Sequence, residues 1–194
     1  MHPALALRQL VPSLKGEFHR ADTRIKLWGV RGFIPVPGPS TVRYGGNTTC
    51  VEVRADGEII VVDAGSGIRF LGMHLSEEFG ERPIRLTLLI SHTHWDHIQG
   101  LPFFQPAYES KNQIRVLGHE GARAGLAAII AGQMETPFFP LSMVDLPSNI
   151  TINELNEMEF SIESACALDV RKPPWHLRRL SALHLRGLDQ LFPG

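Results

Sequence analysis

The sequence predicts a single α/β layered domain, and three observations carry this prediction. Residues 83–91 form a nearly continuous apolar run, as expected of a strand buried on both faces of a sheet. Residues 48–65 contain two β-rich runs around an Asp-Gly turn at Asp56, which is a hairpin signal. Residues 66–80 carry apolar side chains at helical spacing before a glycine, which predicts an amphipathic helix.

The other elements follow in chain order. Residues 24–30 and 112–119 are rich in β-branched and apolar side chains, which favours strands. Between the first strand and the hairpin, residues 31–47 hold too many glycines and prolines for regular structure. Residues 120–134 predict a helix, and the alternation over 150–170 predicts one or two more strands. This mixed order of strands and helices is typical of layered α/β domains.

Composition bounds the class of protein. The chain is 43% hydrophobic and 20% charged, as in soluble globular domains. Its net charge of −1 gives no bulk attraction to nucleic acid or to anionic membranes. Only Cys50 and Cys166 are present, which argues against a disulfide framework and fits a reducing compartment. No signal peptide or apolar run of about 18 residues is found, so we expect a cytoplasmic protein without a membrane partner.

Three histidines and an aspartate follow the predicted buried strand at His92, His94, Asp96 and His97. In an extended segment, side chains two residues apart share a face, so the first three point the same way. Imidazole nitrogens and carboxylate oxygens suit Zn²⁺, Mn²⁺ or Fe. Sites in α/β folds form at the carboxyl ends of strands. The pattern therefore predicts a metal site over the alternative of a solvated histidine-rich loop, with Trp95 packed under that loop.

The stretches "SHTHWDH", "VVDAGSGIRFLG" and "LWGVRGFIPVPGPSTVRYGGNTTCVEV" resemble metallo-β-lactamase-fold hydrolases. Within that fold they are similar to the tRNase Z-like and phosphoribosyl cyclic phosphodiesterase branch, over about residues 25–170. The resemblance implies the first half of an αββα sandwich and a two-metal site, usually zinc, with manganese or iron as alternatives. It implies that His92 and His94 bind one metal and that Asp96 and His97 bind the other. A hydroxide between the metals would then attack a phosphodiester.

Two carboxylates have further expected roles. Asp96 can ligate a metal and also accept a hydrogen bond from the attacking oxygen, which makes it the candidate catalytic residue. Asp63 follows four apolar residues, and burying a carboxylate there is costly unless it is paired. The resemblance implies that Asp63 holds the metal-binding loop without touching the metal. A cap for the helix that starts near Ser66 is the alternative.

The resemblance also implies a phosphodiester substrate: a cyclic nucleotide, a ribosyl cyclic phosphate or an RNA end. The loop over residues 29–49 offers Arg31, Arg43, Tyr44 and Asn47 as candidate substrate-binding residues, since arginine suits phosphate recognition. An ordinary solvated loop is the alternative.

Residues 134–140, "METPFFP", place two aromatic side chains between prolines. They can form a lid over the metals, an apolar contact in a homodimer, or a loop that covers the core.

The expected organisation is an N-terminal extension (1–22), an incomplete metallo-β-lactamase-like domain (23–170) and a basic irregular tail (171–194). The tail has a net charge of +4. The resemblance implies a second half that supplies a bridging aspartate and two more histidines, and the tail does not match it. We do not assign His176 or His184 as ligands. We therefore expect weak or single-metal binding and impaired hydrolysis.

Two alternatives stay open. The first is a non-catalytic metal-binding or regulatory interaction module that retains half of the fold. The second keeps the fold but cuts another bond, as in lactamase or thioesterase relatives, and the arginines of the loop disfavour it.

We also hypothesise a shift of reading frame near Arg171. Relatives carry a segment like Asn-His-Pro-Gly-Gly-Thr-Phe-Gly-Tyr-Arg at this place. Codons for residues 172–178, read from their second base, can give Asn-His-Pro-Gly-Thr-Phe-Gly, although only the glycine under Trp175 is forced. The nucleotide sequence across codons 168–182 tests the hypothesis, and the lack of His-Pro-Gly in the other frame would contradict it.

Overall fold

The computed structural model describes residues 23–55, 57–119, 125–155, 159–162, 166–170 and 183–185. The strands are β1 (Arg24–Gly29), β2 (Cys50–Ala55), β3 (Glu58–Val62), β4 (Arg85–Ile90), β5 (Gln113–His119), β6 (Asn149–Leu155), β7 (Glu159–Ile162), β8 (Cys166–Val170) and β9 (Leu183–Leu185). The α-helices are α1 (Ile68–Phe79), α2 (Trp95–Ile98) and α3 (Leu126–Gly132). Short 3-10 helices are η1 (Pro39–Thr41), η2 (Leu101–Phe103), η3 (Gln105–Tyr108) and η4 (Met143–Asp145).

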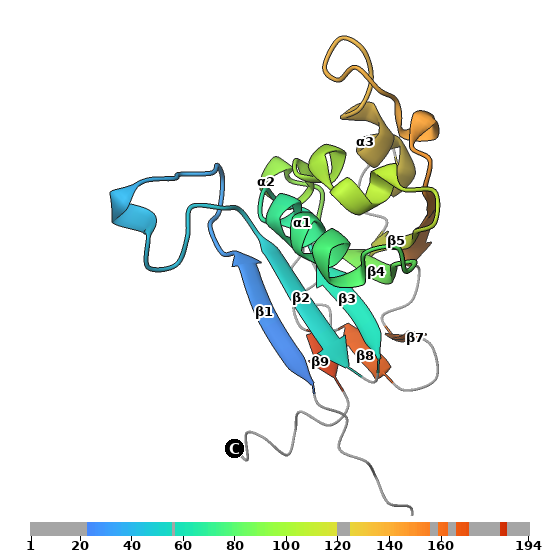
Figure 1. Ribbon diagram of the computed structural model, residues 1–194, viewed down its shortest axis with the longest axis horizontal. Coiled ribbons are helices and arrows are strands. Elements are labelled where there is room, and N and C mark those ends of the chain that lie inside the picture. The colour runs from blue at the N-terminus through green and yellow to red at the C-terminus, as the bar shows by residue number, and fades with distance from the viewer. Residues whose placement is uncertain are drawn as a thin grey trace, which may run out of the picture.

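Six strands form one sheet in the order β1-β2-β3-β4-β5-β6. The pairs β1–β2 and β2–β3 are antiparallel, whereas β3, β4, β5 and β6 run parallel. Crossovers between parallel strands are right-handed, so a strand order that only advances places every crossover on the same face. Figure 1 shows α1, α2 and α3 together on one side of the sheet. The mixed α/β class predicted from the sequence is confirmed.

The core lies between this sheet and the helices. Ile68, Leu71 and Leu75 of α1 are fully buried and belong to one apolar cluster with Leu88 and Ile90 of β4. Every residue of β4 after its first is buried, which confirms the strand predicted to be covered on both faces. Burial of each large aliphatic side chain contributes about 1.5–3 kcal/mol, so this strand and α1 anchor the domain.

The local signals for the hairpin and the first helix are confirmed. Ala55 pairs with Glu58 across a two-residue turn in which Gly57 has a φ of 85°. Helix α1 ends at Phe79, and Gly80 follows with a φ of 55°, a conformation that glycine adopts without steric cost.

The helix predicted over 120–134 differs from the structure. Within the described residues it begins at Leu126, because Gly125 has a φ of 74° and is not helical. Residues 120–124 lie outside the described residues.

The strands predicted over 150–170 are three in number, β6, β7 and β8. Strands β7, β8 and β9 form a separate antiparallel sheet. Within the expected irregular tail, Leu183–Leu185 form β9 and pair with β8. The expected N-terminal extension and the rest of the tail, with His176, lie outside the described residues. In the part of the chain that the structure describes, no helix has the length and apolar composition to cross a bilayer.

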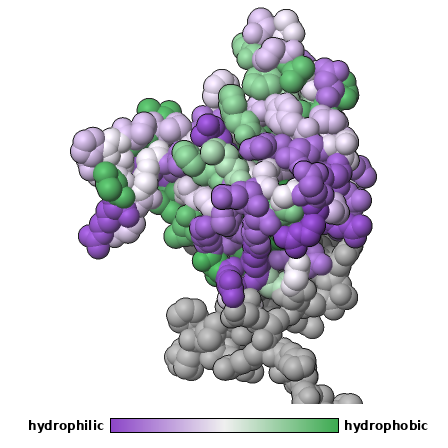
Figure 2. Space-filling model, in the orientation of Figure 1, coloured by the Kyte–Doolittle hydropathy of each residue, from purple (hydrophilic) through white to green (hydrophobic). Residues whose placement is uncertain are grey.

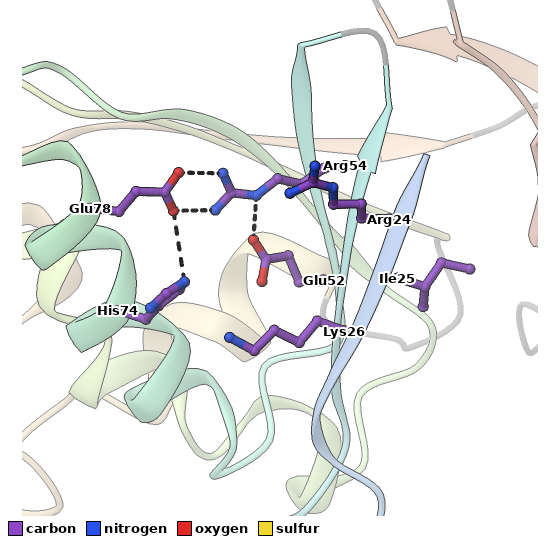
Figure 3. Close-up of a pocket in the computed structure, with 7 residues that line it drawn as sticks. All are labelled: Arg24, Ile25, Lys26, Glu52, Arg54, His74 and Glu78. Atoms are coloured by element: carbon purple, nitrogen blue, oxygen red, sulfur yellow. Dashed lines mark hydrogen bonds and ion pairs between the residues drawn. The ribbon is translucent and has the colours of Figure 1, made fainter. Parts of the chain in front are cut away.

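A charged network ties α1 to the outer strands, as Figure 3 shows. Arg54 of β2 donates to both oxygens of Glu78 on α1, at 2.6 Å each, and its Nε donates to Glu52 at 2.6 Å. Glu52 is 3% exposed and also accepts a hydrogen bond from Trp28 at 2.8 Å. The hydrogen bond from Arg54 is the main reason why the pKa of Glu78 lies below its usual range. The network closes this end of the sheet against α1.

We expect Glu78→Gln to lower the free energy of unfolding by about 0.5–1 kcal/mol at neutral pH, because it removes a partly exposed ion pair. The folded-state pKa of Glu78 is lowered, so this stabilisation is present above the ordinary value of 4.5 and is lost as the pH falls through the folded value. Urea titrations at pH 7 and pH 3 measure the effect. Glu77→Gln, at an exposed position on the same helix, is the control and should cost little at either pH.

Candidate metal centre

The four predicted ligands lie where β4 ends. The strand stops at Ile90, Ser91–His94 continue in non-helical conformations, and α2 begins at Trp95. This is the carboxyl end of a strand whose two neighbours run parallel to it, the usual position for a site in such sheets. These residues thus follow a buried strand, as the sequence predicts.

The histidine rings pack against one another there. The ring centre of His92 is 3.9 Å from that of His97 and 4.6 Å from that of His94. His94 is exposed, whereas His92, Asp96 and His97 are partly buried. The structure therefore brings all three histidines together, with Asp96 beside His97.

Asp63 anchors this cluster from the end of β3. It is 3% exposed, and its Oδ2 accepts hydrogen bonds from His97 Nδ1 at 2.7 Å and from Ser91 Oγ at 2.9 Å. Its Oδ1 accepts the backbone N–H of Ser91 at 2.8 Å. The alternative of a helix cap is wrong, because no side chain caps α1 at Gly67. Asp63 has a φ of 64°, a conformation uncommon outside glycine, and such residues cluster at functional sites.

These hydrogen bonds set the orientation of two imidazoles. A carboxylate only accepts, so His97 Nδ1 and the Ser91 hydroxyl are the donors to Asp63. The hydroxyl can then accept from His92 Nδ1, which lies 3.0 Å away. Both rings would thus carry their proton on Nδ1 and keep a lone pair on Nε2, the form that ligates metals.

Asp96 faces the same place. Its Oδ2 lies 3.4 Å from His97 Nε2. Two donors at neighbouring corners of a zinc tetrahedron, with bonds of about 2.1 Å, are also about 3.4 Å apart. The pair therefore fits zinc in both chemistry and spacing. Across the described ranges, however, no three His, Cys, Asp or Glu side chains are arranged so that they could hold an ion together.

A backbone contact ties Asp96 to the loop after β1. The N–H of Phe33 donates to Asp96 Oδ2 at 2.9 Å, across 63 residues of chain. Burial by itself raises the pKa of Asp96, but the Phe33 hydrogen bond and the nearby His97 outweigh it, so the pKa lies below the usual value. The contact is made by the backbone of Phe33, which has a φ of 69°, while its side chain is 88% exposed.

Gly65 allows the segment after β3 to pass close to the backbone of the cluster. Ala64 N donates to His97 O at 2.7 Å, and Gly100 N donates to Ala64 O at 2.8 Å. A Cβ on Gly65 would stand 2.3 Å from Asp96 O and 2.5 Å from Thr48 Oγ1. Neither atom belongs to a long flexible side chain, so only glycine fits at this position.

Gly65→Ala should therefore lower the free energy of unfolding by about 3 kcal/mol, because residues 92–97, the histidine segment, must shift to accommodate the methyl group. Urea titration followed by circular dichroism measures the loss. Gly132→Ala, where a Cβ meets no atom within 4 Å, is the control. Equal stabilities of the two variants would contradict the packing described here.

The candidate substrate-binding residues lie on a loop that projects from the edge of the sheet (Figure 1). Arg31 lies at its base, in a bridge with Thr48 and two residues from Phe33. Arg43 and Tyr44 lie farther along the loop, with the guanidinium 5.1 Å from the ring centre. Asn47 supports the base, because its backbone oxygen accepts the N–H groups of residues 30 and 31, and its Oδ1 accepts from Ser66. Near its base, the loop contacts the cluster through the N–H of Phe33.

The sequence predicts that Trp95 packs under the loop, and the structure shows that it does not. It is 80% exposed, because α2 begins here and turns this side chain outward. In residues 134–140, Met134 is fully buried, Phe138 is 81% exposed, and Phe139 packs edge-on against Phe103 at 5.7 Å. Figure 2 shows hydrophobic residues near α3 and the segment that follows it. That segment both covers core and exposes apolar surface.

Sequence reasoning missed two contributors to the cluster. Ser91 stands directly before the histidines, and its hydroxyl contacts Asp63, His92 and His97. Its position at the end of the buried strand was the available signal. The backbone N–H of Phe33 has no sequence signal, because any residue other than proline could supply it.

This chain is similar to one known protein family and to several solved structures. The family model of the metallo-beta-lactamase superfamily matches residues 43–156. Among solved structures, a diphosphatase from the PhnP family aligns with a TM-score of 0.53 and 12% identity, over 76% of this chain and 56% of that one. The metallo-beta-lactamase fold protein YhfI from Bacillus subtilis aligns with a TM-score of 0.46 and 14% identity, over 77% and 52%. Unliganded yeast PDE1 aligns with a TM-score of 0.42 and 14% identity, over 76% and 55%.

The chain thus spans about half the length of these three proteins. No curated protein matches it in sequence. The family model covers more than half of the chain and includes α1, the histidine segment and β6.

Proposed function

The chain belongs to the metallo-beta-lactamase superfamily, and on that premise we propose that it is a metal-dependent hydrolase of the phosphodiesterase type. One observation carries the proposal: His97 Nε2 and Asp96 Oδ2 face each other at 3.4 Å while Asp63 holds the other nitrogen of His97. Members of the superfamily bind metal ions, usually zinc. The diphosphatase of similar fold supports, by analogy, a substrate that contains phosphate.

In this proposal His92 and His94 hold one ion, and Asp96 and His97 hold the other. Bound ions of this kind lower the pKa of water and offset phosphate charge. Asp96 orients the attacking oxygen by accepting its proton in a hydrogen bond. Asp63 and Ser91 keep the imidazoles in the ligating tautomer. Zinc is the proposed metal, with manganese or iron as alternatives.

The projecting loop is the proposed wall for the phosphodiester. Arg31 is the residue we place nearest the phosphate, because it lies two residues from Phe33, whose N–H reaches Asp96. Arg43 and Tyr44 are proposed to reach the substrate from farther along the loop, and Asn47 to position its base. Cyclic nucleotides, ribosyl cyclic phosphates and RNA ends are the proposed substrate classes.

The test combines metal content with turnover. The purified chain should contain zinc, manganese or iron, and should hydrolyse bis(4-nitrophenyl) phosphate in a reaction that a chelator stops and added metal restores. Asp96→Asn should lower that rate by at least about 100-fold, since misplaced reacting groups lose about that much. Glu77→Gln removes an exposed carboxylate on α1 and should leave the rate unchanged. Turnover without metal would contradict the proposal.

A second candidate is a non-catalytic metal-binding or regulatory interaction module. One observation favours it: within the described residues, no three ligand side chains converge on one point. For this second candidate we propose that the chain by itself binds metal weakly and hydrolyses phosphodiesters slowly. Stoichiometric metal without any turnover of the aryl phosphodiester would favour the module, and fast turnover would exclude it.

The cytoplasmic location, the homodimer and the domain limits at residues 22 and 170 remain predictions. Analytical ultracentrifugation at two protein concentrations decides the oligomeric state.

A further inference from the structure

An apolar pocket with a volume of about 520 Å³ adjoins the histidine segment. Thr93 and Trp95 form one wall, and both alternate along the chain with the proposed ligands. Residues of α3 and residues 138 and 139 also line the pocket. Because Thr93 and Trp95 precede and follow His94 in the chain, a molecule in this pocket would lie beside the histidine segment.

Four aromatic side chains line the pocket. Trp95 is 80% exposed, Phe103 56% and Phe138 81%, and Phe139 packs edge-on against Phe103. Exposed aromatic rings gathered in one concave place are typical of a ligand site. Planar rings of a ligand can stack on such side chains, as bases do in nucleic-acid-binding proteins.

One polar atom in this pocket lacks a partner. Gln133 lines it, and Gln133 Nε2 is buried without a hydrogen-bond partner among the residues that the structure describes. A buried amide donor of this kind is costly unless something accepts from it. A ligand with a carbonyl oxygen or an unprotonated ring nitrogen would satisfy it.

Charge fixes the orientation of such a ligand. No pocket-lining residue in the described part of the chain is charged, so the pocket does not suit a phosphate. The phosphate of the ligand would instead lie outside the pocket, toward the histidine segment that Thr93 and Trp95 belong to. An aliphatic chain would fit the apolar lining but would leave Gln133 Nε2 unsatisfied.

We propose that this pocket binds the nucleobase of a nucleoside phosphodiester whose phosphate lies at the histidine segment. The proposal rests on the proposed function for the position of the phosphate, and it narrows the substrate to one that carries a nucleobase in this pocket. The base stacks among Trp95, Phe103 and Phe138 and accepts a hydrogen bond from Gln133 Nε2.

The experiment uses uncharged probes, so that it does not depend on metal or turnover. Adenosine, ribose and 1-phenyl-ribose are titrated into the full chain with and without a chelator, and the side-chain amide signals are followed by NMR. Adenosine should bind and move the Gln133 amide signal downfield, with the same affinity in chelator. Ribose should not bind.

Variants separate stacking from hydrogen bonding. Phe138→Ala should weaken adenosine and 1-phenyl-ribose alike by about tenfold. Gln133→Leu should weaken adenosine by about tenfold and leave 1-phenyl-ribose unchanged, because only adenosine accepts from the amide. Phe70→Ala, a 46% exposed aromatic on α1 outside the pocket, is the control and should change nothing.

Binding of ribose as tight as that of adenosine would overturn the proposal on the unmodified chain, even if a variant fails to fold. So would equal affinities of the Phe138 and Phe70 variants for adenosine, or a dependence on protein concentration that shows a second copy of the chain in the pocket. Loss of metal or of turnover, with adenosine binding intact, would instead count against the proposed function alone.

Discussion

Replacing His92 and His94 together by alanine is expected to leave the purified chain without bound zinc, manganese or iron. Their rings lie 4.6 Å apart at the end of β4, and the double change removes both proposed ligands of one ion. An ion that loses both of its proposed imidazole donors is bound too weakly to survive purification. Hydrolysis of an aryl phosphodiester should disappear with the metal. Elemental analysis of the protein measures the metal directly.

His74→Ala provides the matched control. His74 lies on α1 in the charged network, 3.8 Å from Glu78 (Figure 3), and is not one of the proposed ligands. Its removal should leave metal content unchanged. If the double variant keeps the same metal content as the unmodified chain, His92 and His94 are not ligands.

Asp63→Asn should weaken metal binding by about 10–100-fold, the usual cost of changing a residue that orients a ligating histidine. Asn keeps the size of Asp63 and tolerates a φ of 64°, so the backbone is not strained. The change replaces one of two acceptor oxygens with a donor, and either His97 Nδ1 or Ser91 then loses its partner. Competition with a chromogenic zinc chelator measures the affinity.

Ser91→Ala separates the two partners of Asp63. It removes the hydroxyl that contacts His92 but leaves the bond between His97 and Asp63. We expect a smaller loss of affinity than for Asp63→Asn. An unchanged affinity in the Asp63 variant would mean that the carboxylate only supports the fold.

Local signals in the sequence predicted the elements well where glycine fixes the geometry. The turn at Gly57 and the end of α1 at Gly80 both need a positive φ, and glycine is the residue that supplies it. Helix α3 begins later than the sequence predicts, because Gly125 also has a positive φ and is not helical. A glycine within an Ala- and Leu-rich stretch does not by itself show which conformation it takes.

The sequence indicated those features of the candidate site that depend on the chemistry of side chains. A buried carboxylate needs partners, which singles out Asp63 in the sequence, and in the structure His97 is one of those partners. The exposure of Trp95 was missed, because it depends on the residue at which α2 starts. The tie from Phe33 was missed as well, because it joins a backbone group to a side chain 63 residues away.

The wide sequence separation of the groups that build the cluster bears on how the chain folds. The β2–β3 hairpin closes over a two-residue turn, whereas the bonds from Asp63 to Ser91 and His97 span 28 and 34 residues, and that from Phe33 to Asp96 spans 63. Long loops close later than short ones, because more chain entropy is lost before any contact forms. We therefore expect Asp63 and the Phe33 N–H to reach the histidine segment, and to fix the donors there, only after the hairpin has closed. During refolding, uptake of zinc should lag behind the recovery of sheet structure in a stopped-flow experiment.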